Sequence, residues 1–131
     1  MGNAGIVFDH VHLVSEDPES TGSWYEEKLG GKVVGSGESG GSLMVRVAFE
    51  GTTIIIRGQR ANEQLTKKSG LQWGTDHFGF SVNGDFDAYC SDLKSKGVKF
   101  TMDPVDFTPV VRIAYIEAPD NVSIELLQRK G

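Results

Sequence analysis

Phe8-Asp9-His10-Val11-His12-Leu13-Val14 is a stretch that recurs in altered form as Thr75-Asp76-His77-Phe78-Gly79-Phe80-Ser81. Each copy begins with an Asp-His pair and continues as an alternation of apolar residues, the pattern of a half-buried strand. Each copy also precedes a helical pattern and further strand-like segments. We therefore interpret the chain as one half-domain repeated, in which each half brings one histidine to a shared cavity.

The first half is predicted to be a βαβββ module over about residues 6–57. Alternation over residues 6–14 predicts a strand that carries His10 and His12 on one face. The Asp17-Pro18 pair is typical of a helix start and Gly30-Gly31 of a helix end. Three more strands are expected at 32–34, 43–49 and 54–56, and the glycine- and serine-rich stretch between the first two is expected to be a flexible connection that forms a mobile rim.

The second half, about residues 75–128, repeats this order. A strand over 75–82 precedes a helix that Asp85 can cap and that ends near Gly97, with apolar residues at helical spacing that include Cys90. Cys90 is therefore expected in the core. Three strands follow, at 98–102, 110–117 and 122–128. A polar linker of about residues 58–74 connects the modules, and the whole chain, 1–131, is interpreted as one α+β domain of two tandem βαβββ modules.

Composition excludes several classes of function. The chain has 131 residues, a net charge of -5 and a single cysteine. The acidic balance and the lack of a basic run argue against a nucleic-acid partner. One cysteine excludes an intrachain disulfide, and no apolar stretch approaches the length of a membrane span. We expect a cytoplasmic protein that binds neither nucleic acid nor membrane.

The repeat predicts a metal site. Superposing the halves places His77 on His10 and Glu125 on Ile55, and the alternation assigns Glu125 to the same face as the histidines. Burying such polar groups without partners costs about 2 to 7 kcal/mol for a neutral group and more for a carboxylate. Two imidazoles and one carboxylate would form a facial triad for a divalent metal with open positions for substrate oxygens, so His10, His77 and Glu125 are the predicted ligands.

With these residues in place, the chain resembles the vicinal oxygen chelate superfamily, which includes glyoxalase I, methylmalonyl-CoA epimerase, fosfomycin-resistance transferases, bleomycin resistance proteins and extradiol dioxygenases. The resemblance rests on residues 8–13, the helix end at 24–30, residues 76–80, and residues 112–120 running into 124–127. It implies a cupped mixed sheet around a divalent metal, Fe2+, Mn2+, Ni2+ or Zn2+, a small-molecule substrate and a homodimer.

The chain departs from the glyoxalase and epimerase pattern at one ligand. The resemblance implies a Glu or Gln as fourth ligand on the last strand of the first module, where this chain has Ile55. Gln59, two positions beyond Arg57 on the predicted strand face, could supply that ligand by reaching back. Without it, the set of two histidines and one glutamate is more similar to the extradiol dioxygenases and the fosfomycin transferases.

Four further residues are assigned roles around the metal. His12, on the face of His10, is a candidate acid or base, and its alternative is a hydrogen-bonded wall residue. Tyr115 lies ten positions before Glu125, which resembles the position of the active-site tyrosine in extradiol dioxygenases. Arg57 could hold a carboxylate or phosphate of the substrate, or it could simply reach solvent. Trp73, at the exit of the linker, is assigned to substrate binding together with Arg57.

Three functions remain open on this basis. The first is a metal-dependent lyase or isomerase that acts on a small oxygenated metabolite, in which the metal stabilises an enolate while Glu125 or His12 moves a proton. The second is an Fe(II) extradiol-type dioxygenase in which His12 and Tyr115 transfer protons. The third is a metal-free protein that binds a small molecule such as an antibiotic. Retention of the three predicted ligands favours an enzyme, whereas Ile55 weakly favours the binding protein.

Overall fold

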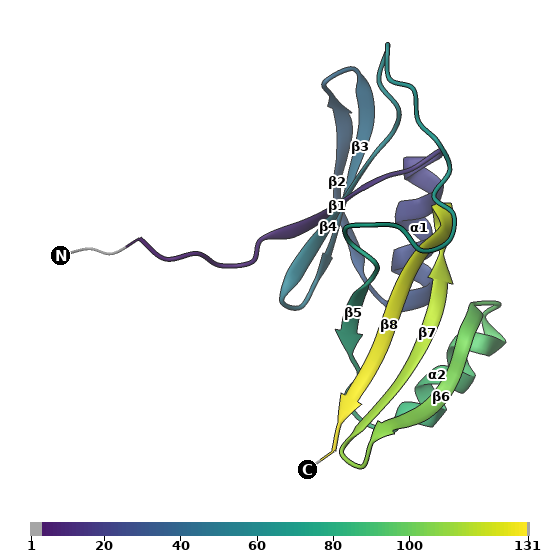
Figure 1. The fold of residues 1–131 in the computed structure, drawn as a ribbon. Helices are drawn as coiled ribbons and strands as arrows, with labels where there is room; N and C mark the ends of the chain where they lie inside the picture. Colours follow the sequence, from purple (N-terminus) through teal and green to yellow (C-terminus); the bar gives the residue numbers. More distant parts are fainter. Residues whose placement is uncertain (1–3, 131) are drawn as a thin grey trace. The chain divides into compact units, whose positions relative to one another are not determined.

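The computed structural model describes residues 4–130, which divide into two compact units, one up to Leu65 (unit 1) and one from Thr66 onward (unit 2). Each unit is one βαβββ module, which confirms the predicted α+β class (Figure 1). The division falls between Leu65 and Thr66, inside the segment expected to be a linker.

Unit 1 consists of β1 (His10–Val14), α1 (Pro18–Leu29), β2 (Lys32–Ser39), β3 (Ser42–Phe49) and β4 (Thr52–Arg57). The sheet has the order β1-β4-β3-β2, with β1 parallel to β4 and the other pairs antiparallel. Helix α1 packs against β2, β3 and β4. The core between helix and sheet is closed by buried residues from both, Tyr25, Val45, Val47, Ile54 and Ile56.

Local chemistry explains the bounds of α1. The Asp17 carboxylate accepts a hydrogen bond from the Ser20 amide, and Pro18 occupies the first turn, where its missing N–H costs nothing. Gly30 ends the helix in the left-handed conformation at φ 79, which glycine adopts without steric cost. The predicted start and end of this helix are therefore confirmed.

Two expectations for unit 1 are wrong. Strand β1 begins at His10 rather than residue 6, because the register of β1 with β4 starts at the pair His10–Thr53. The stretch expected to be a flexible connection is mostly strand, since β2 continues to Ser39 and pairs with β3. The turn of this hairpin is only Gly40-Gly41, both at positive φ, a combination that matches the twist of a two-residue hairpin.

Unit 2 consists of β5 (Phe78–Ser81), α2 (Phe86–Ser95), β6 (Lys99–Thr108), β7 (Val111–Ala118), the 3₁₀ turn η1 (Pro119–Asn121) and β8 (Val122–Arg129). Its sheet has the order β5-β8-β7-β6, again with one parallel pair, β5 and β8. Asp85 caps α2 by accepting from the Ala88 amide, as predicted. Cys90 is 1% exposed, which confirms its place in the core.

Strand boundaries in unit 2 also differ from expectation. Strand β5 begins at Phe78, so His77 immediately precedes the strand rather than lying within it. Strand β6 continues through Pro104 to Thr108, whereas the sequence predicted an end at Met102. Proline is tolerated there because β6 is the edge of the sheet and its pairing with β7 is irregular between Met102 and Val105.

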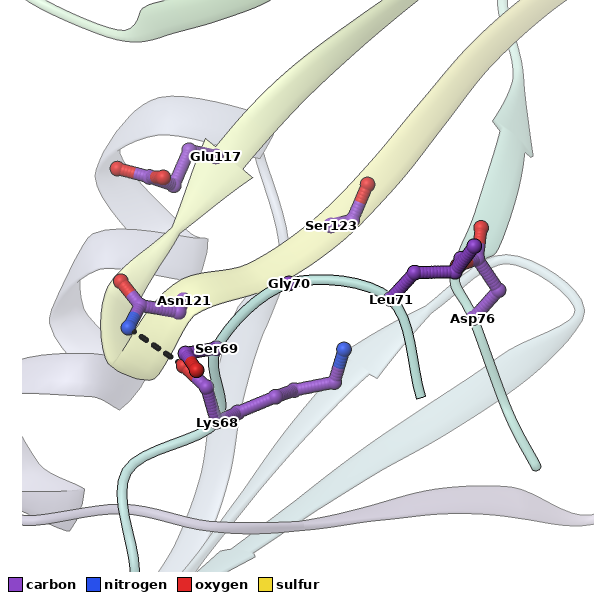
Figure 2. Close-up of a pocket in the computed structure, with 8 residues that line it drawn as sticks. All are labelled: Lys68, Ser69, Gly70, Leu71, Asp76, Glu117, Asn121 and Ser123. Atoms are coloured by element: carbon purple, nitrogen blue, oxygen red, sulfur yellow. Dashed lines mark hydrogen bonds between the residues drawn. The ribbon is translucent and has the colours of Figure 1, made fainter. Parts of the chain in front are cut away.

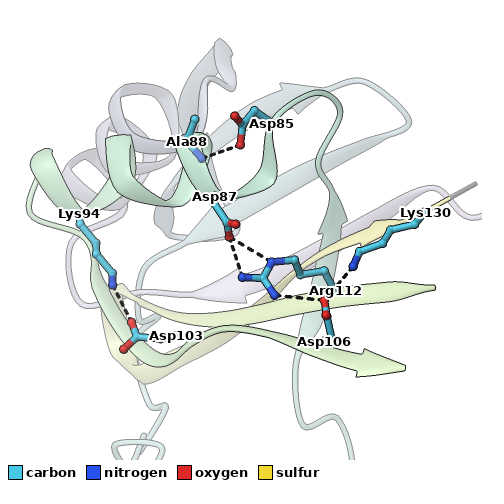
Figure 3. A network of polar contacts seen from close by, with 8 residues as sticks. All are labelled: Asp85, Asp87, Ala88, Lys94, Asp103, Asp106, Arg112 and Lys130. Atoms are coloured by element: carbon cyan, nitrogen blue, oxygen red, sulfur yellow. Dashed lines mark hydrogen bonds and ion pairs between the residues drawn. The ribbon is translucent and has the colours of Figure 1, made fainter. Parts of the chain in front are cut away.

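An ion-pair network ties the outer elements of unit 2 together (Figure 3). The Arg112 guanidinium on β7 pairs with Asp87 of α2 at 3.0 Å and with Asp106 of β6 at 3.1 Å, and Lys130 pairs with Asp106 at 2.9 Å. Hydrogen bonds from Lys130 and Arg112 lower the pKa of Asp106, and those to Asp87 and Asp106 raise the pKa of Arg112. The network connects α2 to the edge strand β6 through charged side chains.

Candidate functional site

Unit 2 gathers three of the predicted site residues. Glu125 of β8 and Tyr115 of β7 are direct cross-strand partners, and His77 lies just before β5, the other neighbour of β8. The His77 Nε2 atom lies 3.2 Å from Glu125 Oε1 and 3.4 Å from the Tyr115 hydroxyl oxygen. The side chains of His77 and Glu125 are only 28% and 21% exposed, so this cluster is partly desolvated.

The Asp76 carboxylate orients the His77 ring. Asp76 Oδ2 lies 2.8 Å from His77 Nδ1, so a protonated Nδ1 donates to it. A neutral imidazole held this way presents the lone pair of Nε2 toward the Glu125 carboxylate. Two electron-pair donors at 3.2 Å repel each other unless a proton or a cation lies between them. In metal sites, a histidine that binds the metal through one ring nitrogen usually donates the N–H of the other to a carboxylate. Asp76, His77 and Glu125 fit that arrangement around a metal ion.

Unit 1 repeats the Asp-His contact. His10 Nδ1 lies 2.7 Å from Asp9 Oδ2, which leaves its Nε2 as the free nitrogen. His12 follows on the same face, with its ring centroid 6.1 Å from that of His10. Partial burial lowers the pKa of His12, and the electrostatic influence of Arg57, His10 and Arg60 lowers it further. His12 is therefore neutral at pH 7 and able to accept a proton.

The strand registers give the internal repeat atomic detail. In unit 1 His12 pairs with Ile55 of β4, and in unit 2 Gly79 pairs with Glu125 of β8. The next strand adds Arg46 beside Ile55. The corresponding residue beside Glu125 is Tyr115. Arg46 is thus the equivalent of Tyr115, on the histidine face of its sheet.

Sequence reasoning left Arg46 unassigned because the two hairpins differ in length. Arg46 lies nine positions before Ile55, whereas Tyr115 lies ten positions before Glu125. The 3₁₀ turn η1 lengthens the second connection, so the equivalence cannot be seen from spacing. The alternation of buried Val45 and Val47 in β3 was the available signal, since it predicts that Arg46 points to the opposite face.

The other residues of unit 1 that were assigned to substrate or metal have partners of their own. Arg57 forms a bidentate ion pair with Glu63, at 2.9 and 3.1 Å. Gln59 lies beyond the end of β4, so the expectation that it continues the strand face is wrong, and its amide donates to the Glu63 carbonyl at 2.6 Å. Trp73 is fully exposed, outside any helix or strand.

A cavity of about 400 Å³ opens in unit 2 next to this cluster (Figure 2). Asp76, which orients His77, contributes to its wall, as does Ser123, two residues before Glu125 on β8. The linker segment around Lys68 forms the opposite wall and is fixed by a hydrogen bond of 2.8 Å from the Asn121 amide to the Lys68 carbonyl. The remaining lining residues are Ser69, Gly70, Leu71 and Glu117.

Two features are absent from the part of the chain that the structure describes. Within residues 4–130, no group of three or more His, Cys, Asp and Glu side chains is gathered closely enough to hold a metal ion. Over the same residues, no helix combines the length and the apolar character that crossing a membrane requires.

The chain belongs to the Glyoxalase/Bleomycin resistance protein/Dioxygenase superfamily, whose family model matches residues 7–126. This confirms the family resemblance. No curated protein matches the sequence significantly.

Solved structures share the fold at low sequence identity. A glyoxylase/bleomycin resistance protein/dioxygenase domain from Frankia sp. EAN1pec is 23% identical with a TM-score of 0.79, covering 98% of this chain and 94% of that one. A glyoxalase family protein from Bacillus cereus is 18% identical with a TM-score of 0.81, covering 98% and 97%. The trypanothione-dependent glyoxalase I of Leishmania major is 18% identical with a TM-score of 0.71, covering 91% and 84%. Likeness at this level describes the fold alone.

Proposed function

We propose that this protein is a divalent-metal-dependent enzyme that acts on a small oxygenated metabolite as a lyase or isomerase. The observation that carries the proposal is the approach of His77 Nε2 to the Glu125 carboxylate while Asp76 holds the other ring nitrogen. His10, oriented by Asp9 in the same way, is the proposed third ligand on the grounds of the internal repeat. Nitrogen and carboxylate donors suit Fe2+, Mn2+, Ni2+ or Zn2+.

A metal bound by these residues would act as a Lewis acid toward neighbouring oxygens of the substrate. The protein's own side chains would move the proton. His12 is neutral because its pKa is lowered, so it can accept a proton, and Glu125 is the alternative base. Tyr115 keeps its proton, since burial and then the charges of Glu125 and Asp76 raise its pKa, and it can donate a hydrogen bond to a developing oxyanion.

The substrate would extend into the cavity beside Asp76, where hydroxyl, amide, ammonium and carboxylate groups line the wall. Arg57 and Trp73 remain proposed substrate contacts. For Arg57 this requires that a substrate anion compete with Glu63, which now occupies both of its terminal nitrogens.

An Fe(II) extradiol-type dioxygenase is the second candidate. Tyr115 favours it, because its hydroxyl lies 3.4 Å from the Nε2 atom of a proposed metal ligand and is held in the protonated state. A phenol in that position could donate a proton during ring cleavage. A metal-free protein that binds a small molecule is the third candidate and would need neither histidine.

Metal content separates these classes. Protein purified without chelator should contain close to one equivalent of divalent metal by elemental mass spectrometry, and His77→Ala should reduce that content strongly. Absence of metal in the wild type, together with unchanged ligand affinity in His77→Ala, would exclude the enzyme. Assays of the Fe(II)-loaded protein on catechols, with and without dioxygen, separate the two enzymes, since oxygen-dependent ring cleavage contradicts the lyase or isomerase.

A homodimer is part of the same proposal. Large apolar side chains of the segment before β1 are exposed to solvent, namely Ile6, Val7 and Phe8. Exposed apolar groups in one contiguous segment are typical of a contact surface. Light scattering during size-exclusion chromatography should give twice the mass of the chain, 14.2 kDa, and a monomeric mass would contradict the dimer.

A further inference from the structure

The histidine face of unit 1 carries an unpaired guanidinium. Arg46 lies in the row that runs across three strands from His12 through Ile55. Its side chain is exposed and, within residues 4–130, forms no hydrogen bond or ion pair. Glu63, by contrast, is held by Arg57 of the same unit through two hydrogen bonds.

The strand beside Arg46 lets the guanidinium lie close against its backbone. Its cross-strand partner on β2 is Gly35, and a Cβ atom added to Gly35 would lie 3.0 Å from the terminal nitrogen of the Arg46 guanidinium. The guanidinium therefore lies over a position that has no side chain. Two residues further along β2, a Cβ atom added to Gly37 would have no atom within 4 Å, so the face is open at that position.

Arg57, two residues after Ile55 on β4, lies on the same face as Arg46. Glu63 offsets Arg57, while Arg46 has no such counter-charge. An anion placed on this face would gain electrostatic stabilisation without displacing an existing partner of Arg46.

The internal repeat shows that this charge is particular to unit 1. At the equivalent row, unit 2 has Gly79, Glu125 and Tyr115, which together supply a carboxylate and a phenol. Unit 1 replaces the carboxylate with Ile55 and the phenol with Arg46. In the same row of the repeat, unit 2 therefore offers a carboxylate and unit 1 offers a guanidinium.

We propose that Arg46 binds a carboxylate or phosphate group of a small molecule on the histidine face of unit 1, beside Ile55 and His12. Taken with the proposed function, on which its role in substrate binding rests, this assigns the substrate to the small oxyanion-bearing metabolites. The guanidinium can bind a planar carboxylate or a phosphate through two parallel hydrogen bonds, and a lysine could not reproduce that geometry.

The test is a titration of metal-free protein with malonate, with inorganic phosphate as the second anion and uncharged malonamide as the matched control, at constant ionic strength. Nitrogen-15 NMR follows the Arg46 Nε–Hε signal and the backbone amides of Ile55 and His12. We expect saturable shifts with malonate or phosphate and none with malonamide. Whichever anion binds more tightly identifies the oxyanion.

Three variants decide the role of Arg46. Arg46→Gln should weaken anion binding by about tenfold or more, and Arg46→Lys by a smaller factor. Arg129→Gln removes an exposed arginine from unit 2 and should bind as the wild type does. Dispersed amide spectra establish that each variant is folded. Absence of saturable shifts, or equal affinity in Arg46→Gln and Arg129→Gln, would overturn the proposal.

Metal binding is measured separately, by Zn2+ titration of the same proteins. Arg46→Gln should bind Zn2+ normally, and His77→Ala should bind malonate normally. If the wild-type protein binds malonate but not Zn2+, the result counts against the proposed enzyme and leaves the Arg46 site standing. If the wild-type protein binds Zn2+ but not malonate, the result contradicts the Arg46 site alone.

Discussion

Asp76→Asn tests the metal site through a residue that is not itself a proposed ligand. Asp76 accepts a hydrogen bond from His77 Nδ1 at 2.8 Å and so directs the lone pair of Nε2 toward Glu125. Asparagine keeps the size of the side chain and can still accept that hydrogen bond through its amide oxygen. It removes the negative charge that makes the imidazole a better donor to a cation.

The structure sets the size of the effect. Removing such a partner typically lowers metal affinity about 10- to 100-fold. Asp76 is 57% exposed and asparagine retains one hydrogen bond, so we expect the lower end, about tenfold, or about 1.4 kcal/mol. Asp76→Ala, which removes the hydrogen bond as well, should approach the upper end. Asp9 is 89% exposed, so Asp9→Asn should have a smaller effect than Asp76→Asn because water screens its charge more fully.

Zn2+ affinity is measured by competition with a chromogenic chelator at pH 7. Asp103→Asn is the control, because it removes the same charge from the same unit. Asp103 is exposed and pairs with Lys94. Equal affinities for wild type, Asp76→Asn and Asp103→Asn would refute the argument that Asp76 orients a metal-binding imidazole. If Asp103→Asn loses as much Zn2+ affinity as Asp76→Asn does, the loss is explained by net charge rather than by the contact with His77.

Three further predictions concern stability and reactivity. Gly31→Ala should destabilise the protein by about 1–3 kcal/mol, since its Cβ would lie 2.6 Å from the Phe49 ring, whereas Gly37→Ala, with open space around it, should be neutral; urea unfolding compares the two. Burial raises the pKa of the Cys90 thiol, so a thiol reagent at pH 8 should label the native protein far more slowly than the unfolded one, and equal rates would contradict burial. The pKa of Asp106 is lowered in the folded state, so its contribution to stability is present above its ordinary pKa of 3.8 and is lost as pH falls through the folded value. The stability difference between wild type and Asp106→Asn should therefore shrink in acid, and a difference independent of pH would argue against the ion pairs.

Much of the fold could be predicted from local sequence. Helix α1 depends on Asp17, Pro18 and Gly30, whose effects are confined to one or two turns. The strands follow from alternation, and the repeated Asp-His pair sets the correspondence of the halves that the registers later show in detail. Strand bounds were less predictable, since β1 starts only where Thr53 is available as a partner.

The sequence by itself determined the family and the two modules. It also determined the face of β8 that carries Glu125, because a periodicity of two residues assigns a strand face without knowledge of neighbours. Tertiary structure alone decided which side chains meet. Glu63, from a connection without regular structure, occupies Arg57, and a turn longer by one residue hides the equivalence of Arg46 and Tyr115. Partners across strands depend on register and turn length, which a local pattern does not encode, and the proposed chemistry depends on those partners.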